Sequence, residues 1–219
     1  MRNFLLFSNR GYTTSKFKDL MKAGRLDIVA HSIIHSFFLS NKIRKDVKMD
    51  IILNGPPDPP KHIEIIPNEK TPFSKKDVGE LLRIVLWKYK KGKKVEALPG
   101  IFIEKNSLEN VITNSKENFD IYVLDKKGDN LESFEFKNKN IMFVLGDHEG
   151  IPKDKKKFLK KHAKGFISLG NIEYFTSQCI VILNYFLDKL YYGSAFDSSN
   201  NNLCSATNIG ISNKNNKRI

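Results

Sequence analysis

The segment IMFVLGDHEGIP, residues 141–152, decides the fold class of this chain. Its first five residues form an unbroken apolar run, which is typical of a strand buried on both faces of a parallel sheet. A short polar loop between Gly146 and Gly150 follows, and Pro152 suits the first turn of a helix. A buried strand, a glycine loop and a helix in this order predict one unit of an α/β sheet.

Apolar runs and alternating patterns elsewhere predict further strands, and helical spacing of apolar residues predicts helices between them. We expect strands at residues 3–8, 47–53, 62–66, 101–104, 120–124, 140–145 and 165–169, with a further short strand at 134–136. We expect helices at residues 25–40, 74–90, 107–115, 152–164 and 175–192. Residues 125–130 are rich in turn formers, and the four prolines of 54–60 exclude a strand there. The alternation predicts an α/β protein with a largely parallel sheet flanked by helices.

Length and composition exclude several protein classes. The 219 residues fit one domain, which we expect at 1–193, followed by a disordered, Asn-rich basic tail at 194–219. Only Cys179 and Cys204 are present, which excludes a disulfide scaffold. No apolar run approaches the roughly 20 residues of a membrane span, and none at the start suits a signal peptide. We therefore expect a cytoplasmic protein.

The positive charge is concentrated in two segments. The chain carries 37 Lys and Arg against 24 Asp and Glu, a net charge of +13, and residues 83–94 and 153–164 hold most of the excess. Concentrated positive charge attracts polyanions, and nucleic acid is the first candidate. Trp87 and Tyr89 lie in the first segment, where one interpretation is stacking on an unpaired base; the apolar neighbours of Trp87 favour burial in the core instead. Candidate phosphate contacts are Arg10, Lys42, Arg44, Lys45 and the lysines of 153–161.

Several catalytic signatures are absent from the sequence, among them a P-loop, a Rossmann glycine fingerprint and a nucleophile elbow. His31 and His35 stand four residues apart on a predicted helix, but no third ligand is near, so we expect no metal site. Cys179 lies in an apolar helical pattern, which favours a buried thiol over a nucleophile. Strand ends that stop in glycine remain, at 145–146 and 169–170, and ligands of open α/β sheets bind beyond such ends.

Longer strings resemble one known family. They are GRLDIVAH (24–31), FFLSNKIRKDV (37–47), LNGPPDPPK (53–61), FVLGDHEGIP (143–152) and ISLGNIEYFTSQCIVILNYFLDKL (167–190). In this order they resemble the archaeal TrmY proteins, methyltransferases of the SPOUT superfamily that use S-adenosyl-L-methionine to methylate N1 of pseudouridine 54 in the T-loop of tRNA. The resemblance implies that cofactor, a tRNA partner, a homodimer, and a SPOUT-type fold whose C-terminal part is a deep trefoil knot. It ends near Leu190, and the sequence after Tyr192 matches nothing in the family.

The resemblance also implies a cofactor site at three successive strand ends. Carried onto this sequence, its residues are Leu124, Gly146, Leu169, Gly170, Asn171, Ile172, Glu173, Tyr174 and Cys179. The apolar members suit an adenine, and the two glycines leave room for a bent ligand.

The implied reaction removes a weakly acidic proton from N1 of pseudouridine. A carboxylate, an arginine that stabilises the developing anion, or water can assist it. The candidate catalytic residues are Arg25 and Asp27 in GRLD, and Arg44 and Asp46 in IRKD. A competing interpretation is that Asp27 only complements the dipole of a helix start. Asp147 and His148, near the expected cofactor, are further candidates.

Two alternative functions stay open from the sequence. One is an N1-specific pseudouridine methyltransferase of small-subunit ribosomal RNA, which shares the fold but usually has a longer chain. The other is a non-catalytic RNA-binding or assembly protein of the same fold, for which the glycine loops at Gly146 and Gly170 have no purpose.

Overall fold

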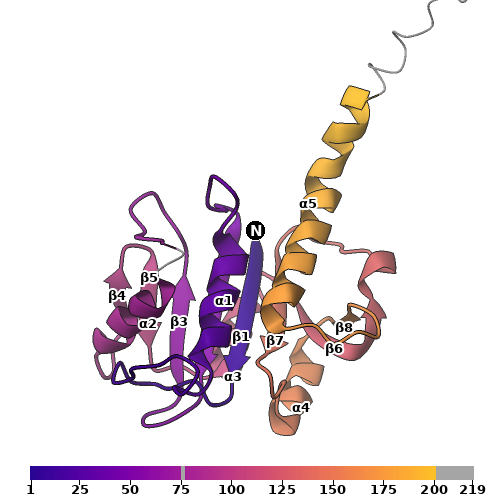
Figure 1. Cartoon of the computed structure of the whole chain (residues 1–219). Helices are drawn as coiled ribbons and strands as arrows, with labels where there is room; N and C mark the ends of the chain where they lie inside the picture. Colours follow the sequence, from indigo (N-terminus) through magenta and orange to yellow (C-terminus); the bar gives the residue numbers. More distant parts are fainter. Residues whose placement is uncertain (75–76, 201–219) are drawn as a thin grey trace, which may run out of the picture. The chain divides into compact units, whose positions relative to one another are not determined.

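The computed structural model describes residues 1–74 and 77–200 (Figure 1). Met1–Val181 forms the larger of two compact units, and the last helix continues from Ile182 into the second. The strands are β1 (Arg2–Ser8), β2 (Val47–Leu53), β3 (Lys61–Ile65), β4 (Val95–Leu98), β5 (Ile101–Glu104), β6 (Asp120–Asn130), β7 (Ile141–Gly146) and β8 (Gly165–Ser168). The helices are α1 (Leu26–Phe37), α2 (Val78–Trp87), α3 (Leu108–Ser115), α4 (Lys153–His162) and α5 (Thr176–Asn200), with a 3-10 turn, η1 (Leu131–Ser133).

The described strands form one sheet in the order β4-β5-β3-β2-β1-β7-β6-β8. From β2 to β8 every neighbouring pair is parallel, whereas β3, β5 and β4 pair antiparallel. The connections explain the change. A parallel pair requires a long crossover, but the proline loop at 54–60 joins β2 to β3 directly, and Pro99 and Gly100 turn the chain between β4 and β5. The predicted α/β architecture with a mostly parallel sheet flanked by helices is confirmed, with an antiparallel edge in addition.

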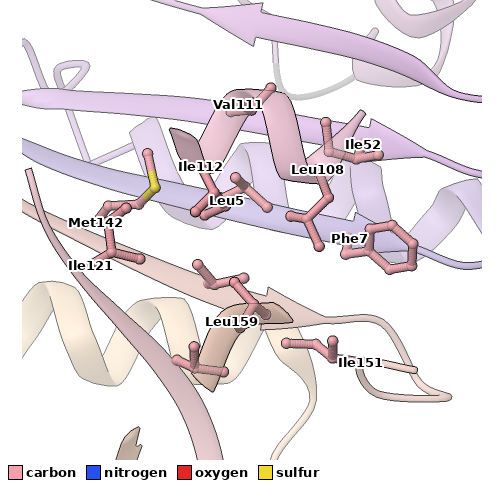
Figure 2. Packing of buried hydrophobic residues seen from close by; sticks show 12 residues of the cluster. Leu5, Phe7, Ile52, Leu108, Val111, Ile112, Ile121, Met142, Ile151 and Leu159 are labelled. Carbon is pink, nitrogen blue, oxygen red and sulfur yellow. The ribbon is translucent and has the colours of Figure 1, made fainter. Parts of the chain in front are cut away.

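The main core cluster lies between the parallel strands and two helices. Figure 2 shows Leu108, Val111 and Ile112 of α3 gathered over Leu5 and Phe7 of β1. Leu159, the single fully buried residue of α4, joins the same cluster. Each buried side chain of this size stabilises the fold by about 1.5–3 kcal/mol, so this cluster fixes β1, β7 and β6 as one rigid platform.

Two predictions about strands are wrong. Residues 134–136 form no strand: they follow η1, and the rings of Phe134 and Phe136 pack edge-on against Tyr122. Residues 125–130 are not a free turn but continue β6, which shifts register and then pairs again with β8. Gly128 permits this close pairing, because a Cβ there would lie 2.5 Å from the backbone of Phe166.

Two helix ends also differ from expectation. Trp87 is 74% exposed, not core, because the buried stripe of α2 runs through Val78, Leu82 and Leu86 and the helix ends one residue later. Helix α5 extends to Asn200, beyond the predicted end at 192. The remainder of the expected tail, residues 201–219, lies outside the described residues, so the domain boundary at 193 stays a prediction. None of the described helices has the length and apolar character needed to cross a membrane.

Candidate functional site

A cavity of about 840 Å³ opens at the carboxyl edge of the parallel strands. This volume falls in the range that holds a small-molecule ligand. The chain reaches it at the register shift of β6 that follows Leu124, where β7 and β8 leave the sheet, and from the starts of α1 and α5. Its lining residues are 25, 27–28, 31, 124–126, 145–151, 156, 169–170 and 172–179, all within Met1–Val181.

The structure gathers nearly all of the expected cofactor residues around this one cavity. The lining contains Leu124, Gly146, Leu169, Gly170, Ile172, Glu173, Tyr174 and Cys179. Asn171 does not line the cavity and is exposed to solvent. The ends of β7 and β8 and the register shift of β6 thus meet at one place, although the role of these residues as ligand contacts stays a prediction. The expected strand end at Leu124 is wrong, because β6 continues to Asn130.

The two glycines of the cavity differ in what they make room for. A Cβ on Gly146 would lie 2.4 Å from the carbonyl carbon of Gly150, so this glycine permits the tight loop 147–150. A Cβ on Gly170 would meet no atom within 4 Å, and its φ of +100° is a backbone conformation that side chains disfavour. Gly146 therefore serves the packing of the chain itself, whereas Gly170 leaves open space beside the backbone.

Asp147 is committed to holding the loop after β7. Its Oδ2 accepts the backbone N–H of Asn9 at 2.6 Å, and its Oδ1 accepts the Asn9 side-chain amide at 3.0 Å and the N–H of Glu149 at 2.9 Å. The Asn9 amide also donates to the carbonyl of Gly150 at 2.8 Å. These bonds make Asp147 the residue that ties the loop 147–150 to the end of β1.

Arg25 and Asp27 form a bidentate ion pair at the wall of the cavity. Nε of Arg25 donates to Oδ1 of Asp27 at 3.0 Å, and Nη2 donates to Oδ2 at 2.9 Å. These bonds hold the pKa of Asp27 below its ordinary value. Arg25 is the one non-glycine residue with positive φ, 65°, among the described residues, and it caps α1. Such strain costs on the order of 1 kcal/mol and concentrates at functional sites.

The second candidate pair, Arg44 and Asp46, lies away from the cavity. Asp46 directly precedes β2, at the amino edge of the parallel strands, and its carboxylate pairs with Arg2 at 2.8 Å. The structure therefore does not bring Arg44 and Asp46 together with Arg25 and Asp27 within one chain.

The thiol of Cys179 belongs to the cavity wall, as expected. Burial raises its pKa to about 11, so the thiol is neutral near pH 7 and unsuited to nucleophilic attack.

Sequence reasoning missed three contributors to the site. Asn9 follows β1, the neighbour of β7, and the rule that ligand sites lie at strand ends would have selected it. Thr176 donates from its hydroxyl to the carbonyl of Gly146 at 2.8 Å and thereby joins the start of α5 to the end of β7. His31, for which the sequence favours a packing or surface histidine over a metal ligand, lines the cavity one helical turn after Asp27. In the part of the chain that the structure describes, no group of three His, Cys, Asp or Glu side chains is arranged to hold a metal ion.

Comparison with known proteins gives a family and close relatives. Residues 1–192 match the model of a family described as "Putative SAM-dependent RNA methyltransferase". The tRNA (pseudouridine(54)-N(1))-methyltransferase of Pyrococcus abyssi is 34% identical over 202 residues, covering 87% of this chain and 98% of the relative. The enzyme of the same name from Methanopyrus kandleri is 35% identical over 199 residues, covering 86% and 93%.

A solved structure supports the fold. Archaeoglobus fulgidus Nep1 bound to S-adenosylhomocysteine superposes with a TM-score of 0.55 at 14% identity, covering 80% of this chain and 74% of that one. At this identity the similarity shows the fold, and residue roles do not transfer from it.

Proposed function

The chain belongs to this family of SAM-dependent RNA methyltransferases, and from that premise we propose that it methylates N1 of pseudouridine 54 in the T-loop of tRNA. Relatives of that name align over nearly their whole length. The observation that carries the proposal is the cavity itself, because β6, β7, β8 and the start of α1 converge on it with apolar walls and a charged pair.

The cavity suits S-adenosyl-L-methionine. Leu124, Leu169 and Ile172 provide apolar surface for an adenine, and the open space beside Gly170 lets a ligand approach the backbone. The bound cofactor supplies an electrophilic methyl group on a sulfonium, which requires no acid to activate it. The task of the chain is therefore to position the target base and to stabilise it as N1 loses its proton.

Arg25 is the residue best placed for that stabilisation. Its Nε and Nη2 are held by Asp27, which leaves Nη1 without a partner among the described residues. A guanidinium stays protonated at neutral pH and stabilises a negative charge on the pseudouridine ring beside it. Asp27 is ionised and accepts two hydrogen bonds from Arg25, so it acts as a positioning residue. The proton that leaves N1 passes to solvent water.

The function is tested with labelled S-adenosyl-L-methionine and three substrates: tRNA transcripts that carry uridine or pseudouridine at T-loop position 54, and small-subunit ribosomal RNA. We expect label in the pseudouridine transcript alone. Label in small-subunit ribosomal RNA in its place would favour the alternative substrate. Failure to bind the cofactor by calorimetry would favour the non-catalytic alternative.

The role of Arg25 is tested with Arg25→Ala and Asp27→Asn. Loss of the guanidinium is expected to lower kcat about 10²- to 10³-fold, with unchanged affinity for S-adenosylhomocysteine. Asp27→Asn keeps a hydrogen-bond acceptor for Arg25, so kcat is expected to fall less in this variant than in Arg25→Ala. A larger loss for Asp27→Asn than for Arg25→Ala would instead identify Asp27 as the base.

The same proposal includes three features of the family: a trefoil knot in the C-terminal part, a homodimer, and a cytoplasmic location. The hydrogen bond from Thr176 to Gly146 supports the knot, because it ties the chain that follows the edge strand β8 back to β7, inside the sheet. The exposed apolar side chains of Ile172, Phe175 and Val181 support an interface with a second copy. Sedimentation equilibrium tests the dimer, and single-molecule stretching tests the knot, since a knotted chain extends to less than its full contour length.

A further inference from the structure

The lysines of α4 fall into two sets that the sequence does not separate. Lys155 pairs with Glu109 of α3 at 2.5 Å, and Lys156 pairs with Asp125 of β6 at 2.7 Å. These two are partly buried and fasten the helix to its neighbours. Lys153, Lys157, Lys160 and Lys161 are all exposed, and no carboxylate of the described residues lies within ion-pair distance of them.

The four unpaired lysines share one face of the helix. Their spacing of four, three and one residues places them within about a third of the helix circumference, over a length of about 12 Å. Leu159 holds the opposite side in the core. The result is a short positive ridge that no internal negative charge neutralises, so it is available to a polyanion.

This lysine face stands next to the cavity. The loop that enters α4 lines the cavity through Gly150 and Ile151, and Lys156 of α4 lines it as well. A base that enters the cavity must be everted from its strand, and the phosphates on either side of it then pass close to the rim. We propose that Lys153, Lys157, Lys160 and Lys161 bind the phosphate backbone of the RNA substrate beside the cavity; this inference rests on the proposed function.

The surface of α4 favours RNA over a lipid membrane. A helix that lies on a membrane exposes a large apolar face beside its cationic one. Among the described residues, α4 exposes no large hydrophobic side chain, because Leu159 is fully buried and Phe158 is partly buried. An acidic protein surface is the remaining alternative, and the experiment below separates it from RNA.

The test removes three charges from each of two basic regions. In one variant, Gln replaces Lys153, Lys157 and Lys161. In the control variant, Gln replaces Lys90, Lys91 and Lys93, three lysines that are also exposed and carry the same total charge. Binding of a T-loop tRNA transcript is measured by fluorescence anisotropy from 50 to 300 mM salt. The α4 variant is expected to bind about tenfold more weakly at low salt, with a log–log salt slope shallower by about 2 to 3. Affinity for S-adenosylhomocysteine and kcat at saturating tRNA are expected to stay unchanged, so that the loss falls on KM.

Three outcomes overturn the inference. The salt slope of the α4 variant is unchanged, or the control variant loses as much affinity for tRNA as the α4 variant does. In the third outcome, the α4 variant loses as much affinity for poly-glutamate, which mimics an acidic protein surface, as it loses for tRNA. The experiment distinguishes a failure of the proposed function from a failure of the proposed role of the lysine face. If the unmodified protein binds tRNA with a steep slope but transfers no methyl group, the function fails. If it methylates tRNA and the α4 variant does so with the same KM, only the proposed role of the lysine face is contradicted.

Discussion

Two regions of the molecule, one in the sheet and one at the start of α1, collect acidic and basic side chains, and burial gives them different roles. On β2, β3 and β5, both ring nitrogens of His62 face carboxylates, Asp50 at 2.7 Å and Glu104 at 3.1 Å. Asp50 is fully buried and also accepts the Asn3 amide at 2.7 Å. At the cavity, Arg25 and Asp27 form a similar pair but face open space. The first region joins strands together, while the second leaves part of its charge available to a ligand.

The interior network depends on protonation of His62. Burial opposes the positive charge, but the hydrogen bonds to Asp50 and Glu104 outweigh it and hold the pKa of His62 above its ordinary value. Burial likewise opposes charge on Asp50, and the bond from His62 holds the pKa of Asp50 below its ordinary value. A ring that donates on both sides is cationic, so the network is a compensated group of buried charges and not a free acid and base.

The largest expected difference between the regions is in stability. Asp50 also pairs with Lys48 at 3.5 Å. Asp50→Ala removes this fully buried partner from His62 and Lys48 and is expected to cost about 3–5 kcal/mol of unfolding free energy. Asp27→Ala removes a partner that solvent can replace and is expected to cost about 1 kcal/mol or less. Urea denaturation of both variants measures this. Equal losses would mean that burial does not distinguish the two regions.

A second, smaller difference is expected between the two glycines of the cavity. Gly146→Ala forces a methyl group against the backbone of Gly150 and is expected to destabilise the protein by about 1–3 kcal/mol. Gly170→Ala meets no atom and is expected to cost about 1 kcal/mol from its positive φ alone. Calorimetry with S-adenosylhomocysteine on the folded Gly170→Ala variant then reports contact with the ligand. Unchanged affinity would place the ligand away from Gly170.

The smallest expected effect is on the pH dependence of stability. Because the pKa of His62 is raised in the folded state, its contribution is complete below about pH 6.5 and is lost as the pH rises through the folded pKa. Because the pKa of Asp50 is lowered, its contribution is present above about pH 4 and is lost as the pH falls further. Unfolding free energies of the unmodified protein should therefore decline on the alkaline side, and His62→Gln should remove that decline. A decline that persists in His62→Gln would assign it to another group.

The sequence predicts strongly patterned features and misses those that depend on distant contacts. Strand β2 was predicted to the residue, and the helix expected at 107–115 is α3, which Ser107 caps with its hydroxyl accepting the N–H of Asn110 at 3.3 Å. Residues 95–98 were missed as β4, because four residues with one buried side chain carry no clear alternation. The exposure of Trp87 was missed because it depends on where α2 ends.

The candidate site follows the same division. Its glycine loops are visible in the sequence, because glycine after an apolar run is a local pattern. The hydrogen bonds that Asn9 makes to Asp147 are not visible, since they join residues that only the order of the sheet brings together. The division of the α4 lysines into paired and unpaired sets likewise depends on Glu109 and Asp125, which lie on other elements.

The central place of β1 has a consequence for synthesis of the protein. This apolar strand is made well before one of its two partners, β7, because residues 9–140 lie between the two strands in the sequence. At bacterial-type translation rates that interval lasts roughly 10 s, during which one edge of β1 lacks its final neighbour. An unpaired apolar edge readily pairs with other chains. We therefore expect the nascent protein to require protection from chaperones until β7 emerges.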